Sequence, residues 1–328
     1  MCQFNQSLFS VVVPLHNESA GLSMFHKDLL EVIHETAGDS YEIIYCDDGS
    51  NDGTAEMVQE WNKADPKVKL LKLSRNFGKE SALSAGIAEA SGQAILMLDG
   101  DGQHPVELIP KFIDDWNKGA KVVIGVRTNN KSDGAFKHFG SWLFYKVFNK
   151  LTGKKLLPGS TDFRLIDSSV QREFLKLKES DRLTRGLIDW LGFERSYINF
   201  EANERAQGNA SYSRRKLMGL AANSFVSLTP VPLHIFGYVG LFITTSSLLL
   251  GLSVIFEQLL LGDPLHWRFT GTAMIGILML FLVGIVLISQ GILSLYISHI
   301  HSQSKQRPLY VVDYAASAGV KEDRHAKI

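Results

Sequence analysis

Two acidic side chains and an amide are closely spaced in the segment LDGDGQHP, at residues 98–105. Asp99 and Asp101 offer carboxylate oxygens and Gln103 offers a carbonyl oxygen. Such ligands suit a six-coordinate Mg²⁺ or Mn²⁺ that takes its remaining ligands from water and a diphosphate. Because Asp and Gly are also common in turns, the segment could instead be a solvated turn. Its position directly after the apolar run Ala94–Leu98 favours the metal site, with His104 expected to be a loop residue rather than a ligand.

Other polar side chains also follow short apolar runs. Acidic groups at a strand end can hydrogen-bond the base or ribose of a nucleotide, and Asp47 and Asp48 follow the run Glu42–Cys46. Asn17 and Glu18 follow Pro14 in the same way, although they could equally be a loop residue and a helix start. The downstream Asp52 and Thr54 are typical of a turn and a helix N-cap.

The elements that must position these side chains alternate along residues 1–212. The expected strands are Phe9–Pro14, Glu42–Cys46, Val68–Leu73, Ala94–Leu98 and Val122–Val126. The expected helices are Ser19–Thr36, Thr54–Asn62, Ser81–Glu89 and Val106–Trp116. This alternation predicts an α/β fold with a mostly parallel central sheet. The polar motifs then fall at the carboxyl ends of the strands, where ligands bind in such sheets.

Two long stretches lack Asp, Glu, Lys and Arg, namely 217–256 and 269–304. Each is longer than the roughly 20 apolar residues that cross a bilayer as a helix, so we expect two transmembrane helices near 233–256 and 269–294. Cations flank them on the outer sides, at 214–216 and at Lys305 and Arg307. The positive-inside rule therefore predicts an integral membrane protein whose two termini are cytoplasmic.

These signals divide the chain into four parts. Residues 1–212 are expected to form a cytoplasmic domain that carries the polar motifs, 213–231 an interfacial amphipathic helix, and 232–304 the two spans with a short extracytoplasmic loop at 257–268. Residues 305–328 form a cytoplasmic tail that is expected to be partly disordered, with Leu309–Val312 docking on the domain. No signal peptide is expected, since no charged segment followed by an apolar stretch opens the chain.

Composition excludes several classes of protein. The chain has 34 Lys and Arg, 34 Asp and Glu, and 45% hydrophobic residues. A net charge of zero disfavours a nucleic-acid binder, and the apolar content excludes general disorder. Two cysteines, Cys2 and Cys46, are too few for a disulfide framework.

Taken together, the motifs VVVPLHNE, DDGSNDGT, SRNFGKE and DGDGQHP resemble, in this order, family 2 glycosyltransferases with the GT-A fold. With two C-terminal spans, the chain is similar to polyprenyl-phosphate glycosyltransferases such as bactoprenol glucosyltransferases and dolichol-phosphate mannose synthases. The resemblance covers about residues 9–300. It implies an enzyme of a bacterial inner membrane that moves one sugar, with UDP-glucose as the favoured donor, to a polyprenyl phosphate such as undecaprenyl phosphate.

The resemblance also implies roles for individual residues. The nucleotide-sugar pocket would contain Pro14, Asn17, Glu18, Asp47, Asp48, Arg75, Lys79, Asp99 and Asp101. The metal would be held by Asp99, Asp101 and Gln103, and the catalytic residues would be Asp101, Asp162 and Arg164. The acceptor phosphate would meet Arg127, Arg164, Arg205, Ser211 and Tyr212. Asn130 stands where the family often has a second basic residue, and Ser211 and Tyr212 abut where it often places a Lys between them.

The implied reaction needs little proton chemistry, because a phosphate oxygen is already anionic near neutral pH. Asp162 would orient the acceptor or act as a base, or could simply cap a turn. Attack opposite the leaving diphosphate predicts inversion at the sugar. Three alternatives stay open: another sugar (mannose, aminoarabinose or an N-acetylhexosamine), a processive polysaccharide synthase, and a non-catalytic scaffold. A homo-oligomer is also left open, since Gly237 and Gly240 could permit close helix packing.

Overall fold

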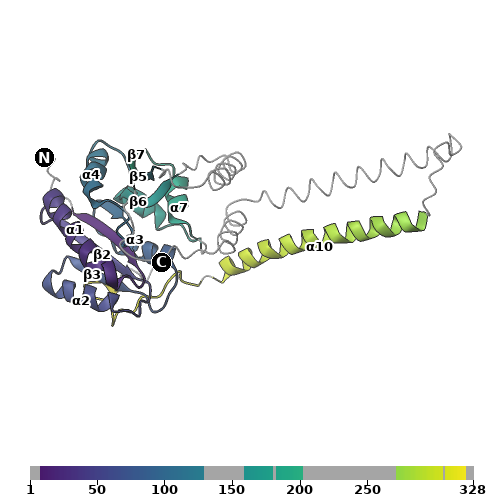
Figure 1. The fold of residues 1–328 in the computed structure, drawn as a ribbon, viewed down its shortest axis with the longest axis horizontal. Coiled ribbons are helices and arrows are strands. Elements are labelled where there is room, and N and C mark those ends of the chain that lie inside the picture. The colour runs from purple at the N-terminus through teal and green to yellow at the C-terminus, as the bar shows by residue number, and fades with distance from the viewer. Residues whose placement is uncertain (1–7, 129–158, 180–181, 202–270, 306, 323–328) are drawn as a thin grey trace. The chain divides into compact units, whose positions relative to one another are not determined.

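The computed structural model describes residues 8–128, 159–179, 182–201, 271–305 and 307–322 (Figure 1). The chain divides into two compact units. The first consists of residues 1–149, 154–210 and 307–328, and the second of residues 150–153 and 211–306. Each unit is described by itself. The predicted interfacial helix 213–231, the first span, the loop 257–268, Arg205, Ser211 and Tyr212 lie outside the described residues.

A seven-stranded sheet forms the centre of the first unit. Its strands are β1 Phe9–Leu15, β2 Tyr41–Asp47, β3 Val68–Lys72, β4 Ala94–Met97, β5 Val122–Arg127, β6 Ser160–Asp167 and β7 Arg195–Phe200. They lie in the order β3-β2-β1-β4-β6-β5-β7. All neighbouring pairs are parallel except those of β6, which is antiparallel to both β4 and β5. The predicted α/β fold with a mostly parallel sheet is confirmed.

Helices cover both faces of this sheet (Figure 1). They are α1 Ser19–Ala37, α2 Thr54–Ala64, α3 Lys79–Glu89, the short 3₁₀ turn η1 Val106–Leu108, α4 Ile109–Asn117, α6 Ser168–Phe174 and α7 Thr184–Trp190. Successive strand side chains point to opposite faces. Accordingly, Val11 and Val13 pack with α1, α2 and α4, whereas Val12 packs with α3, α6 and α7. Two hydrophobic cores therefore hold the sheet from either side.

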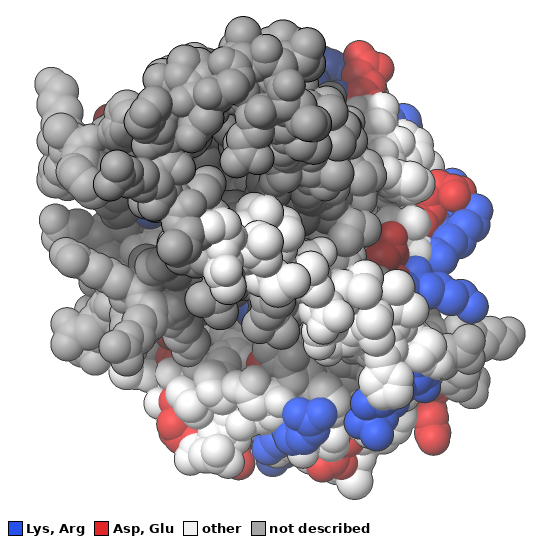
Figure 2. All heavy atoms as spheres, turned by 90° about the vertical axis from the view of Figure 1, so that its right-hand side faces the viewer, with Lys and Arg blue, Asp and Glu red and all other residues white. Residues whose placement is uncertain are grey.

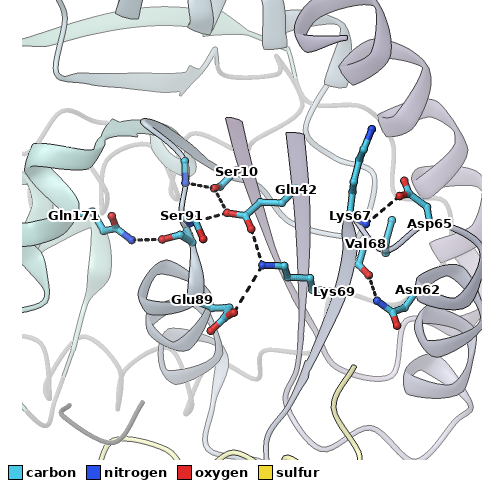
Figure 3. Close-up of polar contacts among 12 residues, drawn as sticks. Ser10, Glu42, Asn62, Asp65, Lys67, Val68, Lys69, Glu89, Ser91 and Gln171 are labelled. Atoms are coloured by element: carbon cyan, nitrogen blue, oxygen red, sulfur yellow. Dashed lines mark hydrogen bonds and ion pairs between the residues drawn. The ribbon is translucent and has the colours of Figure 1, made fainter. Parts of the chain in front are cut away.

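A buried ion network closes the amino end of the sheet, away from the strand ends where ligands are expected (Figure 3). Glu42 accepts hydrogen bonds from Ser10 Oγ (2.5 Å), the Ser91 N–H (2.6 Å) and Lys69 Nζ (2.7 Å). Lys69 also lies 3.8 Å from Glu89. Burial raises the pKa of Glu42, but these donors outweigh it and the net pKa is lowered. The network joins β1, β2, β3 and the end of α3.

The C-terminal segment 307–322 packs along β3, the edge strand of the sheet. Isolated antiparallel bridges pair Leu70 with Ala318 and Leu73 with Val312. Tyr310 is buried in the core beside α3 and α6. The predicted docking of Leu309–Val312 is confirmed, and it extends further along the tail than the sequence indicated. The tail covers backbone groups that an edge strand would otherwise expose.

The second unit contains α10, Gly271–Ser304. Within the residues that the structure describes, no helix combines the length and apolar character of a membrane span. Large apolar side chains of α10 are nevertheless exposed, among them Ile275, Met279, Val286 and Ile300.

In the view of Figure 2, the described Lys and Arg side chains lie interleaved with Asp and Glu.

Candidate active site

Hydrogen bonds join the loops that follow β1 and β2 at the carboxyl edge of the sheet. The Asn17 N–H donates to Ser50 Oγ (2.9 Å), and the Asn17 side-chain oxygen accepts from the Asn51 N–H (3.0 Å). Asn17 has a φ of 56°, in the left-handed region that Asn tolerates better than most residues. Nearby, the Glu18 N–H donates to Thr54 Oγ1 (3.1 Å). Asn17 and Glu18 therefore fix one loop against the other.

Asp47 and Asp48 both accept hydrogen bonds from backbone N–H groups. Asp47 is fully buried, and each of its carboxylate oxygens lies 3.2 Å from the Ser50 N–H nitrogen. Asp48 accepts from the N–H groups of Phe77 (2.7 Å) and Gly78 (2.8 Å). Burial raises the pKa of both acids above the usual value, although these donors oppose the shift. Asp48 thus fastens the loop after β3 to the end of β2.

The two loops approach so closely that only glycine fits between them. Gly49 has a φ of 70°, and a Cβ there would lie 2.8 Å from the backbone of Arg75 and of Asn76. The exposed Arg75 guanidinium lies over the Phe77 ring at 4.0 Å. The loop that carries Arg75 is therefore held against the turn after β2, at the edge where the sequence predicts the nucleotide.

His16 connects three loops, a role that the sequence did not indicate. Its Nδ1 lies 3.0 Å from the Asp48 carbonyl oxygen, and its Nε2 lies 3.1 Å from the Asn76 amide nitrogen and 3.3 Å from that of Asn17. A carbonyl oxygen can only accept, so Nδ1 carries the proton and Nε2 accepts from the amides. The His16 ring thereby holds the ends of β1, β2 and β3 together.

Lys79 joins two acids that are far apart in the sequence. Its ammonium nitrogen lies 2.7 Å from Asp99 Oδ1 and 2.8 Å from Asp162 Oδ2. Burial would lower the pKa of Lys79, but the two carboxylates outweigh it and raise that pKa. Burial would raise the pKa of Asp162, but Lys79 outweighs it and lowers that pKa. The structure therefore brings the predicted residues Lys79, Asp99 and Asp162 into one cluster.

The segment after Asp99 forms a compact turn. Asp101 Oδ1 accepts from the Gln103 N–H at 3.1 Å, and the Asp99 N–H donates to His104 Nδ1 at 3.0 Å. His104 is buried and stacks on Phe163, with ring centroids 5.1 Å apart. His104 therefore closes the turn, which agrees with its prediction as a loop residue.

The acids of this turn can be tested against the expected cation. Among the described residues, no three His, Cys, Asp or Glu side chains gather so that they alone could hold a metal ion. Asp99 and Asp101 offer carboxylate oxygens on one turn, and Asp99 is 27% exposed. Mg²⁺ is often bound by one or two carboxylates together with substrate phosphates and water. The donor set fits a cation that is shared with a diphosphate.

Arg164 lies inside the protein, where its guanidinium contacts protein groups. It is 1% exposed and donates to the Thr161 carbonyl oxygen (2.9 Å), Asp189 Oδ1 (2.8 Å) and Ser160 Oγ (2.6 Å). The Arg185 carbonyl oxygen is a further acceptor at 3.3 Å. Arg164 thus supports β6 and α7 from within, and its guanidinium is not presented to a phosphate as the sequence analysis expected.

Two predicted residues remain to be placed. Arg127 is the last residue of β5 and is exposed, and its N–H donates to the Gly159 carbonyl oxygen at 2.8 Å. Pro14 is partly buried near the end of β1, where it pairs in register with Cys46. Both therefore lie at the same carboxyl edge of the sheet as the acids.

The family model for glycosyl transferase family 2 matches residues 10–175. This range runs from β1 to the end of α6 and includes Lys79, Asp99 and Asp162. The chain belongs to this family. A bactoprenol glucosyl transferase of Shigella phage SfV is 35% identical over 92% of this chain and 97% of its own length. The uncharacterized glycosyltransferase YkcC of Bacillus subtilis is 33% identical over 96% of each chain. This family 2 protein is therefore a glycosyltransferase, and its likeness to these relatives extends well beyond residues 10–175.

Solved structures give a more distant likeness. Glucosyl-3-phosphoglycerate synthase from Mycobacterium tuberculosis, in complex with Mn²⁺, UDP and phosphoglyceric acid, aligns with a TM-score of 0.47 at 21% identity. The alignment covers 68% of this family 2 chain and 77% of that one.

Proposed function

We propose that the protein transfers a single sugar, glucose from UDP-glucose, to a polyprenyl phosphate at the cytoplasmic face of a bacterial membrane. The observation that carries this proposal is the 35% identity to a bactoprenol glucosyl transferase over nearly the whole of both chains. A match of this extent includes the uncharged stretches 217–256 and 269–304 as well as the sheet. A lipid acceptor is consistent with these two uncharged stretches.

The cluster of acids and cations suggests how the donor would be bound. The loop of Arg75, held by Asp48 and His16, would contact the nucleotide, since an Arg side chain suits phosphate and base edges. Asp99 and Asp101 would hold Mg²⁺ or Mn²⁺, which when bound would offset charge on the leaving diphosphate. Lys79 lies beside Asp99 and would add positive charge to the same place.

Asp162 would act at the acceptor side. It stands opposite Asp99 across the Lys79 ammonium, and its lowered pKa keeps it ionised near neutral pH. An ionised carboxylate can orient the acceptor, whose phosphate oxygen is already an anion and needs no strong base. Arg127, exposed at the end of β5, would meet the acceptor phosphate together with Arg205, Ser211 and Tyr212. Direct attack opposite the diphosphate would invert the anomeric centre.

We further propose that residues 232–304 anchor the enzyme with two spans, at 233–256 and 269–294, joined by an extracytoplasmic loop at 257–268. The absence of charged residues from 217–256 and 269–304 supports this arrangement. Cations at 214–216 and at Lys305 and Arg307 favour cytoplasmic termini. Maleimide labelling of a cysteine placed in 257–268 from the outside of intact cells tests the topology.

A donor panel tests the reaction. The full-length chain in detergent is incubated with undecaprenyl phosphate, Mg²⁺ and one nucleotide sugar at a time, and lipid products are identified by mass spectrometry. We expect a hexosyl-phosphate lipid with UDP-glucose and inverted anomeric configuration by NMR. Products from a different sugar only, repeated additions of sugar, or no product with any donor would each overturn the proposal in favour of one of the alternatives.

Two variants show whether the turnover arises at this site. Asp101→Asn removes a charge from the proposed cation site and should lower turnover at least about 100-fold, by analogy with the loss of other preorganised electrostatic groups. The matched control is Asp39→Asn, because the Asp39 side chain is 92% exposed and forms its ion pair with Lys67, far from the turn of Asp101 in the sequence. Full activity in Asp101→Asn would contradict the cation assignment.

A further inference from the structure

Lys79 occupies a position between acids in which a metal ion would also be expected. Its nitrogen is within 2.8 Å of one oxygen from each of Asp99 and Asp162. These acids come from different parts of the sheet, since Asp99 follows β4 and Asp162 lies within β6. The ammonium thus joins the ends of two strands through their carboxylates.

The backbone of Lys79 is fixed on both sides. Lys79 is the first residue of α3, and the preceding Gly78 has a φ of 98° and donates its N–H to Asp48 at 2.8 Å. The next residue, Glu80, accepts from the Thr184 N–H at 2.8 Å. The Lys79 side chain can therefore change its direction while its Cα stays in place, and it is 44% exposed, which leaves room for such movement.

The charges of this cluster determine whether the Lys79 ammonium and a divalent cation can both occupy it. Asp99, Asp101 and Asp162 contribute three negative charges, and Lys79 contributes one positive charge in direct contact with two of them. A divalent ion at Asp99 would compete with the ammonium for the same carboxylate and would be repelled by it at short range. When a diphosphate arrives with the ion, it brings negative charge that can accept the displaced ammonium.

We propose that Lys79 is an internal counter-ion that keeps the divalent cation out of the site until the nucleotide sugar is present. The cation then enters with the diphosphate, and Lys79 moves from Asp99 to a phosphate oxygen of the donor. Lys79 thus couples donor binding to cation binding. This inference rests on the proposed function, since it assigns an order of binding to the same site.

Mn²⁺ alone is the probe for this inference. Free Mn²⁺ is measured by electron paramagnetic resonance during titration of the full-length protein in detergent, without nucleotide, for the wild type, Lys79→Met and Lys79→Arg. We expect Lys79→Met to bind Mn²⁺ at least about tenfold more tightly than the wild type, because the competing charge is gone. Lys79→Arg keeps the charge and should stay within about threefold of the wild type. Adding UDP should tighten Mn²⁺ binding in the wild type by a larger factor than in Lys79→Met.

Arg75→Met is the matched control, since Arg75 is a cation at the same edge that contacts Asn76 and Phe77 instead of an acid of the cluster. Its Mn²⁺ affinity without nucleotide should match the wild type. The inference is overturned if Lys79→Met gains no affinity, if no protein binds Mn²⁺ without nucleotide, or if Arg75→Met gains as much as Lys79→Met. Circular dichroism confirms that each variant is folded. This titration needs neither sugar nor lipid, so its result does not depend on the donor panel. The binding order can therefore be refuted while the proposed reaction is confirmed, or confirmed while the proposed reaction is refuted.

Discussion

Replacing Arg164 by Met should unfold the catalytic domain at a lower temperature rather than remove a phosphate contact. The guanidinium makes four hydrogen bonds to protein acceptors, and its ion pair with Asp189 is largely buried. Removing one partner of a buried pair costs about 3–5 kcal/mol, since the carbonyl groups lose their donor and Asp189 keeps the more distant Arg195, at 3.8 Å. A domain of this size loses about 2–4 °C in melting temperature per kcal/mol, so we expect a drop of about 6–20 °C.

Differential scanning fluorimetry in detergent measures this shift, with Arg172→Met as the control. Arg172 is on α6 and exposed, and loss of an exposed side chain without buried partners typically changes stability by no more than about 0.5 kcal/mol. Turnover is assayed on the same samples below the melting temperature. If Arg164→Met melts with the wild type and yet loses turnover and acceptor affinity, the supporting role is wrong and Arg164 acts on the substrate directly.

Two other predictions concern parts of the fold that flank the site. Burial lowers the pKa of His26 to about 4, so between pH 6.5 and 4 the unfolded chain binds a proton that the folded chain does not, and stability falls by about 3 kcal/mol as the pH decreases across this window. His26→Phe keeps a ring stacked on Trp61 and should flatten that part of the pH dependence in urea unfolding, and an unchanged slope would contradict the assignment. Asp313→Pro removes the N–H that donates to the Lys72 carbonyl oxygen at 2.8 Å, and should cost about 1–3 kcal/mol. Limited proteolysis should then cleave the tail faster than in the wild type, whereas equal protection would show that this pairing does not retain the tail.

The first half of the fold could be predicted closely from local sequence. Apolar runs bounded by turn residues placed β1 to β5 within one or two residues of their observed ends, and helical spacing did the same for α1 and α2. This succeeded because most of these strands are buried on both faces, so that their sequences are nearly continuous apolar runs. The order of the motifs along the chain also predicted which strand ends carry the polar side chains, since parallel strands end at one edge.

Contacts between residues far apart in the chain could not be predicted from the sequence in the same way. β6 was not predicted as a strand, because STDFRLID opens with three polar residues and includes the charged Arg164, which is buried only because α7 and Thr161 supply its acceptors. Nor did the sequence show that Lys79 would meet Asp162, 83 residues later. The position of His16 between three loops likewise depends on strand order, which a pattern of single residues does not contain. Spacing indicates which residues could react, but not which of them the fold uses for its own support.

The division between supporting and reacting residues follows from burial and partner type. Asp47, Asp48 and Arg164 are buried and bonded to backbone groups, to a serine and to a neighbouring acid, so they shape the loops that form the edge of the site. Lys79 and Asp99 are more exposed and contact each other as ions, and such a contact can be exchanged for one with a substrate ion at little cost in stability. In the proposed function, this exchangeable pair would therefore bind the donor and the cation, while Asp47 and Asp48 fix the neighbouring loops. If the protein brings two phosphate-bearing substrates together, as proposed, such exchangeable charges would neutralise the incoming anions without unfolding the loops that position them.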